Sequence, residues 1–239
     1  MRKLVWLVVL AIPLIVALTL PARVALWWFD PPEEIGDVRG TIWRGQALWR
    51  QPGQAPLDLT WRWRSGLSWH WRVSQVRGGS TVLNGIGRPV SGGLALEDVS
   101  GRLDVTRADI QLWMMNTRAR GYLEFDIERA VMVDGQPPEI AGQIVWREAA
   151  LEGTVHESLG EILVDLTPGR QRQQARVESL QPAPVTVRGT IDLEVDQYTV
   201  DLWLRASPDR PDLDRQLAWM GERQSDGQIR IRLSGALGW

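Results

Sequence analysis

The sequence predicts an all-β protein: an N-terminal transmembrane helix followed by one antiparallel β-rich domain with one short helix near the C-terminus. Three observations predict it. An uncharged run lies near the N-terminus, the rest alternates apolar and polar residues with a period of two, and turn residues recur every 10–15 positions. Alternation gives a sheet one apolar and one polar face. A sandwich, an open curled sheet and a partial barrel all fit this pattern.

The first element is the expected membrane anchor. Residues 4–20 form a run of 17 without charge, behind the basic pair Arg2 and Lys3. As a helix this run would span about 25 Å, close to the ~30 Å of a bilayer core. The helix is expected to continue to residue 28, with Arg23 reaching toward the surface and tryptophans in the interface. The predicted anchor residues are Leu4, Val5, Trp6, Leu7, Leu10, Leu14, Leu18, Leu20, Trp27 and Trp28.

A cleaved signal peptide is the alternative for this segment. Signal peptides have shorter apolar stretches and a small-x-small cleavage site. Here the run is longer and no clean site follows, so an uncleaved anchor is favoured. Basic residues before the span place the N-terminus in the cytoplasm and the bulk of the chain in the periplasm of a bacterial cell. The expected organisation is a cytoplasmic tip at 1–3, the anchor at 4–28, a linker at 29–36 and a periplasmic β domain at 37–239.

The later elements follow from the alternation and its breaks. The pattern predicts one hairpin from segments 57–64 and 69–76, and a second from segments 189–195 and 198–204. A short helix is expected from Pro211, with Asp209 or Asp212 near its cap and Gly221 at its end. Further strands are expected around residues 99–105, 122–127, 142–146 and 229–233, whereas 108–116 fits either a strand or a helix.

The tryptophans are unusually many, 14 against two Tyr and two Phe. Four of them, Trp61, Trp63, Trp69 and Trp71, share one face of the first hairpin, opposite arginines and His70. This face is either sheet core or an open surface for a lipid, a glycan or a partner strand, and it is the candidate interaction face. Elsewhere, Trp43 and Trp203 stand at positions that suit a sheet core, and Trp219 is expected on the apolar side of the short helix.

Composition and motifs point away from catalysis. The chain has no Cys and only two His, with no nucleophile motif beside either. It has no phosphate-binding glycine loop in a strand-to-helix context. The net charge is −2, and about −5 for the exported part after Arg2, Lys3 and Arg23 are removed, which disfavours nucleic-acid binding. We therefore expect a non-enzyme with no cofactor, no metal and no nucleic-acid partner.

Several segments resemble the type II secretion system protein N family, also called general secretion pathway protein N. They are GTIWRGQA at 40–47, LTWRW at 59–63, GQIVWREA at 142–149, LAWMG at 217–221 and DGQIRIRLSG at 226–235. The resemblance implies a non-catalytic, single-pass inner-membrane component of the machine that exports folded proteins across the outer membrane. It also implies contacts with other inner-membrane secretion subunits and with the outer-membrane secretin. It carries over no catalytic residue.

Two other classes of function compete with this interpretation. A membrane-anchored lipid-binding or lipid-transfer protein would use the apolar face of a curled sheet to shield acyl chains. A periplasmic hydrolase or glycan-binding module would need a polar site, for which the sequence offers no motif.

Overall fold

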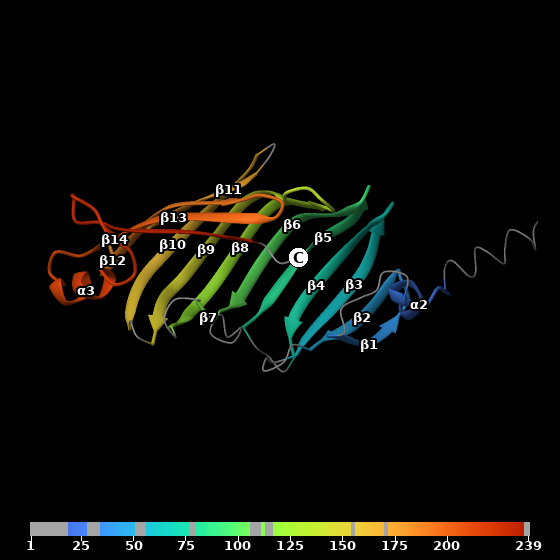
Figure 1. Cartoon of the computed structure of the whole chain (residues 1–239). Helices are drawn as coiled ribbons and strands as arrows, with labels where there is room; N and C mark the ends of the chain where they lie inside the picture. The colour runs from blue at the N-terminus through green and yellow to red at the C-terminus, as the bar shows by residue number, and fades with distance from the viewer. Residues whose placement is uncertain are drawn as a thin grey trace, which may run out of the picture. The chain divides into compact units, whose positions relative to one another are not determined.

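The computed structural model describes residues 19–27, 34–50, 56–76, 80–105, 111–112, 117–153, 156–169 and 172–236 (Figure 1). The chain divides into two compact units, residues 1–79 and 80–239. The β domain expected at 37–239 thus takes in strands of both units. The predicted anchor lies mostly outside the described residues, and only its end, from Leu20 through Trp27, falls within them.

Unit 1 is a small antiparallel sheet preceded by a short helix. The helix α2 covers Ala22–Trp27. The sheet order is β1-β2-β3-β4. The strands are β1 (Ile35–Gly40), β2 (Arg44–Trp49), β3 (Leu57–Ser65) and β4 (Ser68–Gln75).

Unit 2 is a longer open antiparallel sheet with one short helix, α3 (Pro211–Leu217). Its strand order is β5-β6-β8-β9-β10-β11-β12-β13-β15-β14, and β7 pairs with β8. The strands are β5 (Val82–Val90), β6 (Gly93–Asp104), β7 (Gln111–Leu112), β8 (Thr117–Val133), β9 (Glu139–Glu152), β10 (Glu157–Pro168), β11 (Gln173–Ser179), β12 (Val185–Leu193), β13 (Gln197–Ala206), β14 (Glu222–Arg223) and β15 (Ile229–Ala236). The all-β prediction, in its open-sheet form, is confirmed.

The core of unit 2 lies on one face of its sheet, which we call the inner face. Antiparallel register brings Phe125, Ile144, Val164 and Val177 into one cross-strand row, because directly paired residues share a face. The buried cluster continues toward the C-terminal strands and is closed by α3. Its members are Ala149, Leu151, Leu159, Ile162, Val177, Val185, Val187, Leu204, Leu213, Leu217, Ile229 and Ile231.

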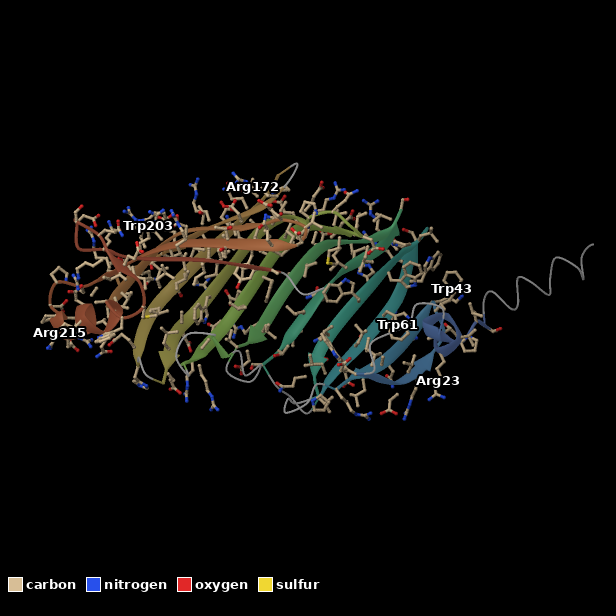
Figure 2. All side chains as sticks on the ribbon, viewed as in Figure 1. Arg23, Trp43, Trp61, Arg172, Trp203 and Arg215 are labelled. Atoms are coloured by element: carbon tan, nitrogen blue, oxygen red, sulfur yellow. The ribbon has the colours of Figure 1, made fainter. Side chains whose placement is uncertain are left out.

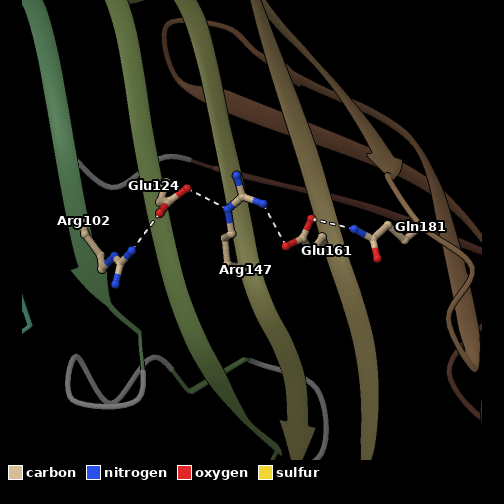
Figure 3. Close-up of polar contacts among 5 residues, drawn as sticks. All are labelled: Arg102, Glu124, Arg147, Glu161 and Gln181. Carbon is tan, nitrogen blue, oxygen red and sulfur yellow. Dashed lines mark hydrogen bonds and ion pairs between the residues drawn. The ribbon is translucent and has the colours of Figure 1, made fainter.

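The opposite, outer face of unit 2 carries paired charges. Arg102 on β6 binds Glu124 on β8 at 2.9 Å, and Arg147 on β9 binds the same carboxylate at 2.6 Å (Figure 3). Arg147 also reaches Glu161 on β10 at 2.8 Å, and Gln181 donates to Glu161 at 3.3 Å. These bonds lower the pKa of Glu124, with the hydrogen bond from Arg147 the largest cause. These four charged side chains, two arginines and two glutamates, therefore neutralise one another.

The short helix begins where it was expected but ends earlier. Pro211 occupies its first turn, whereas the residue at the N-cap is Arg210, with no side-chain cap. Asp209 accepts a hydrogen bond from the Ser207 hydroxyl and does not cap the helix, whereas Asp212, the other expected residue, lies in its first turn. The helix ends at Leu217, and three residues in tighter turns separate it from Gly221.

Three tryptophan placements from the sequence are wrong. Trp203 lies on the outer face, with the Arg230 guanidinium 4.9 Å from its ring centroid, because Leu202 and Leu204 take the inner positions of β13. Trp43 lies between β1 and β2 rather than in a strand. Trp219 is 82% exposed, since α3 ends before it.

Candidate functional site

The four candidate tryptophans share one face of the sheet in unit 1. Trp61 is directly paired with Trp71, and Trp63 with Trp69, across the β3–β4 hairpin. His70 pairs with Arg62 and faces the other way, as the alternation predicts. The tryptophans are only partly buried, and Trp63 is 44% exposed. The face is therefore neither a closed core nor a fully open surface.

The chain between β1 and β2 is fastened to this face by indole hydrogen bonds. The Nε1 of Trp61 donates to the carbonyl of Thr41 at 3.1 Å, and that of Trp69 donates to the carbonyl of Ile42 at 2.8 Å. The ring of Trp43 packs edge-on against that of Trp63, with centroids 5.9 Å apart and planes at 84°. We call residues 41–43 the junction loop.

The junction loop also holds the end of the apolar N-terminal run. Pro21 forms a β-bridge with Thr41, and the N–H of Ile42 donates to the carbonyl of Leu20 at 3.1 Å. Ala22, at the start of α2, is 3% exposed. Figure 2 shows Arg23, Trp43 and Trp61 gathered around this helix. The tryptophan face thus supports the point where the N-terminal segment meets the β sheet.

Part of the tryptophan face remains available for contact. Trp63 donates its indole N–H to Gly66 within its own hairpin at 2.9 Å, and Leu67 beside it is 67% exposed. Trp71 keeps its Nε1 buried without a hydrogen-bond partner among the described residues. An exposed apolar side chain beside half-buried aromatic rings is typical of an interaction surface.

The other face of the same sheet is strongly basic, and we call it the arginine face. One row runs Arg44–Arg62–His70, and another runs through Arg39 on β1 and Arg72 on β4. These side chains are exposed.

The arginine face lacks internal neutralisation. The register of β3 places one acidic residue, Asp58, on this face. The five arginines of the face form no ion pair with any described residue. They are Arg39, Arg44, Arg62, Arg64 and Arg72.

Within the described ranges, no group of three or more His, Asp or Glu is placed to hold a metal ion. No helix in that part of the chain is both long enough and apolar enough to cross a membrane. The predicted anchor residues from Leu4 to Leu18, together with Trp28, lie outside the described part.

The fold and the site together define an all-β protein of open antiparallel sheet with a tryptophan face and an arginine face. A family model described as type II secretion system (T2SS), protein N matches residues 32–232. The chain belongs to this family, which confirms the resemblance seen in the sequence and supports a role in type II secretion. Neither the curated proteins nor the solved structures contain a significant match.

Sequence reasoning missed the junction loop. The motif at 40–47 could have indicated the loop, since Gly40 has φ +90 and Gly45 leaves no room for a Cβ beside the Trp61 ring. The backbone bridge to Leu20 and Pro21 has no side-chain signature.

Proposed function

We propose that this chain is a non-catalytic, membrane-anchored component of the type II secretion machinery that binds other secretion subunits through its β sheets. The uncharged run 4–20 of the predicted anchor 4–28 crosses the inner membrane with the N-terminus in the cytoplasm, residues 21–28 lie at the periplasmic surface of the membrane, and the β units work in the periplasm. Family membership supports the role in secretion. The observation that carries the anchoring is the backbone bridge between Leu20–Pro21 and the junction loop, which ties the apolar run to folded structure.

The partner contact is proposed to use the free edge of β15. The short strand β14 pairs only with Ile229 and Arg230, and no described residue pairs with the same edge further on. The Arg230 carbonyl faces Gly221 on the β14 side. Because backbone groups alternate direction along a strand, those of Arg232 and Ser234 point to the same edge. Such groups can bind an added strand of a partner.

Purification from intact membranes tests this proposal. The full chain, tagged at its C-terminus and produced in its own host, is cross-linked in cells and purified, and the co-purified proteins are identified. We expect other inner-membrane secretion subunits and the secretin, and we expect deletion of the chain to reduce export of secreted proteins. Recovery of no secretion subunit, with export unchanged, would contradict the proposal.

A second candidate function is lipid binding by the inner face of unit 2. Leu83, Leu123, Phe125 and Ile144 lie on this face toward its N-terminal strands, outside the buried cluster, and remain partly exposed. An acyl chain would cover such residues. Mass spectrometry of the purified chain tests this alternative, which predicts stoichiometric phospholipid that survives detergent exchange.

A further inference from the structure

We infer that the arginine face of unit 1 docks on the anionic phospholipid headgroups of the membrane that the chain enters. This inference rests on the proposed anchoring and adds a second membrane contact to it. The face consists of Arg39, Arg44, Arg62, Arg64 and Arg72, spread over all four strands of the unit. At ~4.8 Å between strands, four strands span roughly 14 Å.

Charge is the first argument. The five guanidinium groups are exposed and form no ion pair with any described residue. Asp58, on the same face, is partly buried and forms no ion pair with them. Uncompensated guanidinium groups bind phosphate oxygens through paired hydrogen bonds. Several of them on one surface attract anionic lipid additively.

Position in the chain is the second argument, and it favours lipid over an acidic protein. Ile42 is hydrogen-bonded to Leu20, which ends the predicted membrane-spanning run 4–20 just before Pro21. Arg44 follows two residues later, so its Cα lies within about 7 Å of that of Ile42. If residues 4–20 span the bilayer, the arginine face therefore begins where the span reaches the headgroups. The chain itself would thus bring the lipid headgroups to the arginine face, whereas a separate acidic protein would have to be recruited.

The experiment places a fluorescent probe on the arginine face. The chain has no cysteine, so Gln46→Cys gives a unique thiol for an environment-sensitive dye. Gln46 is exposed and its cross-strand partners are Arg39 and Thr60. The labelled full chain is reconstituted in vesicles of phosphatidylcholine alone or of phosphatidylcholine with phosphatidylglycerol. We expect a blue-shifted emission in the anionic vesicles only, and a loss of the shift at high salt.

A triple substitution tests whether the arginines of this face, and not the overall charge of the protein, cause the docking. The triple variant R62Q/R64Q/R72Q should weaken docking about fivefold per arginine, roughly 100-fold in total, and should abolish the shift. The matched control R129Q/R176Q/R188Q removes three exposed arginines of unit 2 and should keep it. A dye at Thr199→Cys in unit 2 should not respond to the lipid.

Flotation of the vesicles distinguishes a failure of docking from a failure of anchoring. Flotation with phosphatidylcholine alone reports insertion of the apolar segment, which the arginines do not control. If the chain does not insert, docking predicts flotation with anionic vesicles only, lost in the triple variant. Equal emission in both vesicles together with no lipid-dependent flotation would overturn the inference. So would a triple variant that behaves like the parent.

Discussion

Units 1 and 2 treat their arginines and their apolar faces differently. In unit 2, Arg102 and Arg147 are bound to carboxylates on neighbouring strands, and α3 closes a buried core. In unit 1, the arginines of β2, β3 and β4 have no acidic partner among the described residues, and the tryptophans opposite them are half-buried. Among the described residues, unit 2 thus pairs most of its arginines with carboxylates, whereas unit 1 pairs none of the five on its arginine face.

This difference indicates a division of labour. A sheet that neutralises its own charges keeps its shape without a partner, and its free edge is where we propose that a partner strand adds. A sheet with uncompensated charge on one face and aromatic rings on the other is suited to a boundary between water and lipid. The following substitutions test the comparison, from the largest expected effect to the smallest.

Removing core volume from unit 2 should have the largest effect. Leu217 is 2% exposed in the cluster that α3 closes. Leu217→Ala should lower the free energy of unfolding by about 2–5 kcal/mol through lost burial and an unfilled cavity. Leu67→Ala in unit 1, at a side chain 67% exposed, should change it by less than ~0.5 kcal/mol. Urea unfolding measures both, and similar losses would contradict the contrast between the two units.

Two proline substitutions on β15 test which backbone groups face the free edge. Leu233 lies between the residues whose backbone groups point outward, so its N–H points toward β13, where it pairs with Val200. Leu233→Pro should cost about 1–3 kcal/mol by leaving a buried acceptor unpaired. Ser234→Pro removes an outward N–H and should leave stability within ~0.5 kcal/mol. The reverse order of the two effects would show that the inferred strand direction is wrong.

The indole bonds of the junction loop should contribute less. Trp69→Phe removes the donor to Ile42 and should cost about 0.5–1.5 kcal/mol. It should also speed hydrogen exchange of the Ile42 N–H, which is bonded to Leu20. Trp203→Phe in unit 2 is the matched control, because its ring lies against Arg230 and has no contact with the junction loop among the described residues. Equal exchange rates in the two variants would show that the indole bond of Trp69 does not stabilise the contact between the junction loop and Leu20.

Acid should weaken the ion pairs that Glu124 forms with Arg102 and Arg147 in unit 2. The hydrogen bonds from Arg147 and Arg102 lower the pKa of Glu124 below its usual 4.5, so the folded state holds this proton less tightly than the unfolded state. The stabilisation is fully present above pH 4.5 and is lost as the pH falls from there through the lowered pKa. Urea midpoints across this range should fall less steeply for Glu124→Gln than for the parent. An unchanged slope would show that the ion pairs of Glu124 do not contribute to the free energy of unfolding.

The smallest effect on stability is expected for the arginine face. Each of Arg62→Gln, Arg64→Gln and Arg72→Gln should change the free energy of unfolding by less than ~0.5 kcal/mol, because none breaks an ion pair with a described residue. Thermal unfolding of the detergent-solubilised chain checks this. A large loss would mean that these charges serve the fold instead of an external partner.

Alternation in the sequence was enough to predict much of the fold, and the exceptions have physical causes. The hairpin of β3 and β4 is confirmed because only one of its faces is apolar. In β13, Leu202, Trp203 and Leu204 are all apolar, so alternation could not assign the inner face. Segment 108–116 contains the two-residue strand β7 at Gln111–Leu112, too short to give a period.

The candidate site was predictable in part. The opposition of tryptophans and arginines on β3 follows from the period of two. The bridge between Leu20–Pro21 and Thr41 joins backbone groups about twenty positions apart, and backbone bonds leave no mark on residue type. The lack of acidic partners for the arginines depends on the register of neighbouring strands, which alternation alone does not determine.

Site-specific cross-linking from the edge of β15 tests the central claim most directly. Ser234→Cys gives a single thiol on that exposed edge, and Thr186→Cys gives one on β12, two strands away from the edge. Both full-length variants are treated with a thiol-reactive photo-cross-linker in cells with an active type II system. The account predicts adducts with a secretion subunit from position 234 and none from position 186. Adducts from both positions, or none with any secretion subunit, would contradict it.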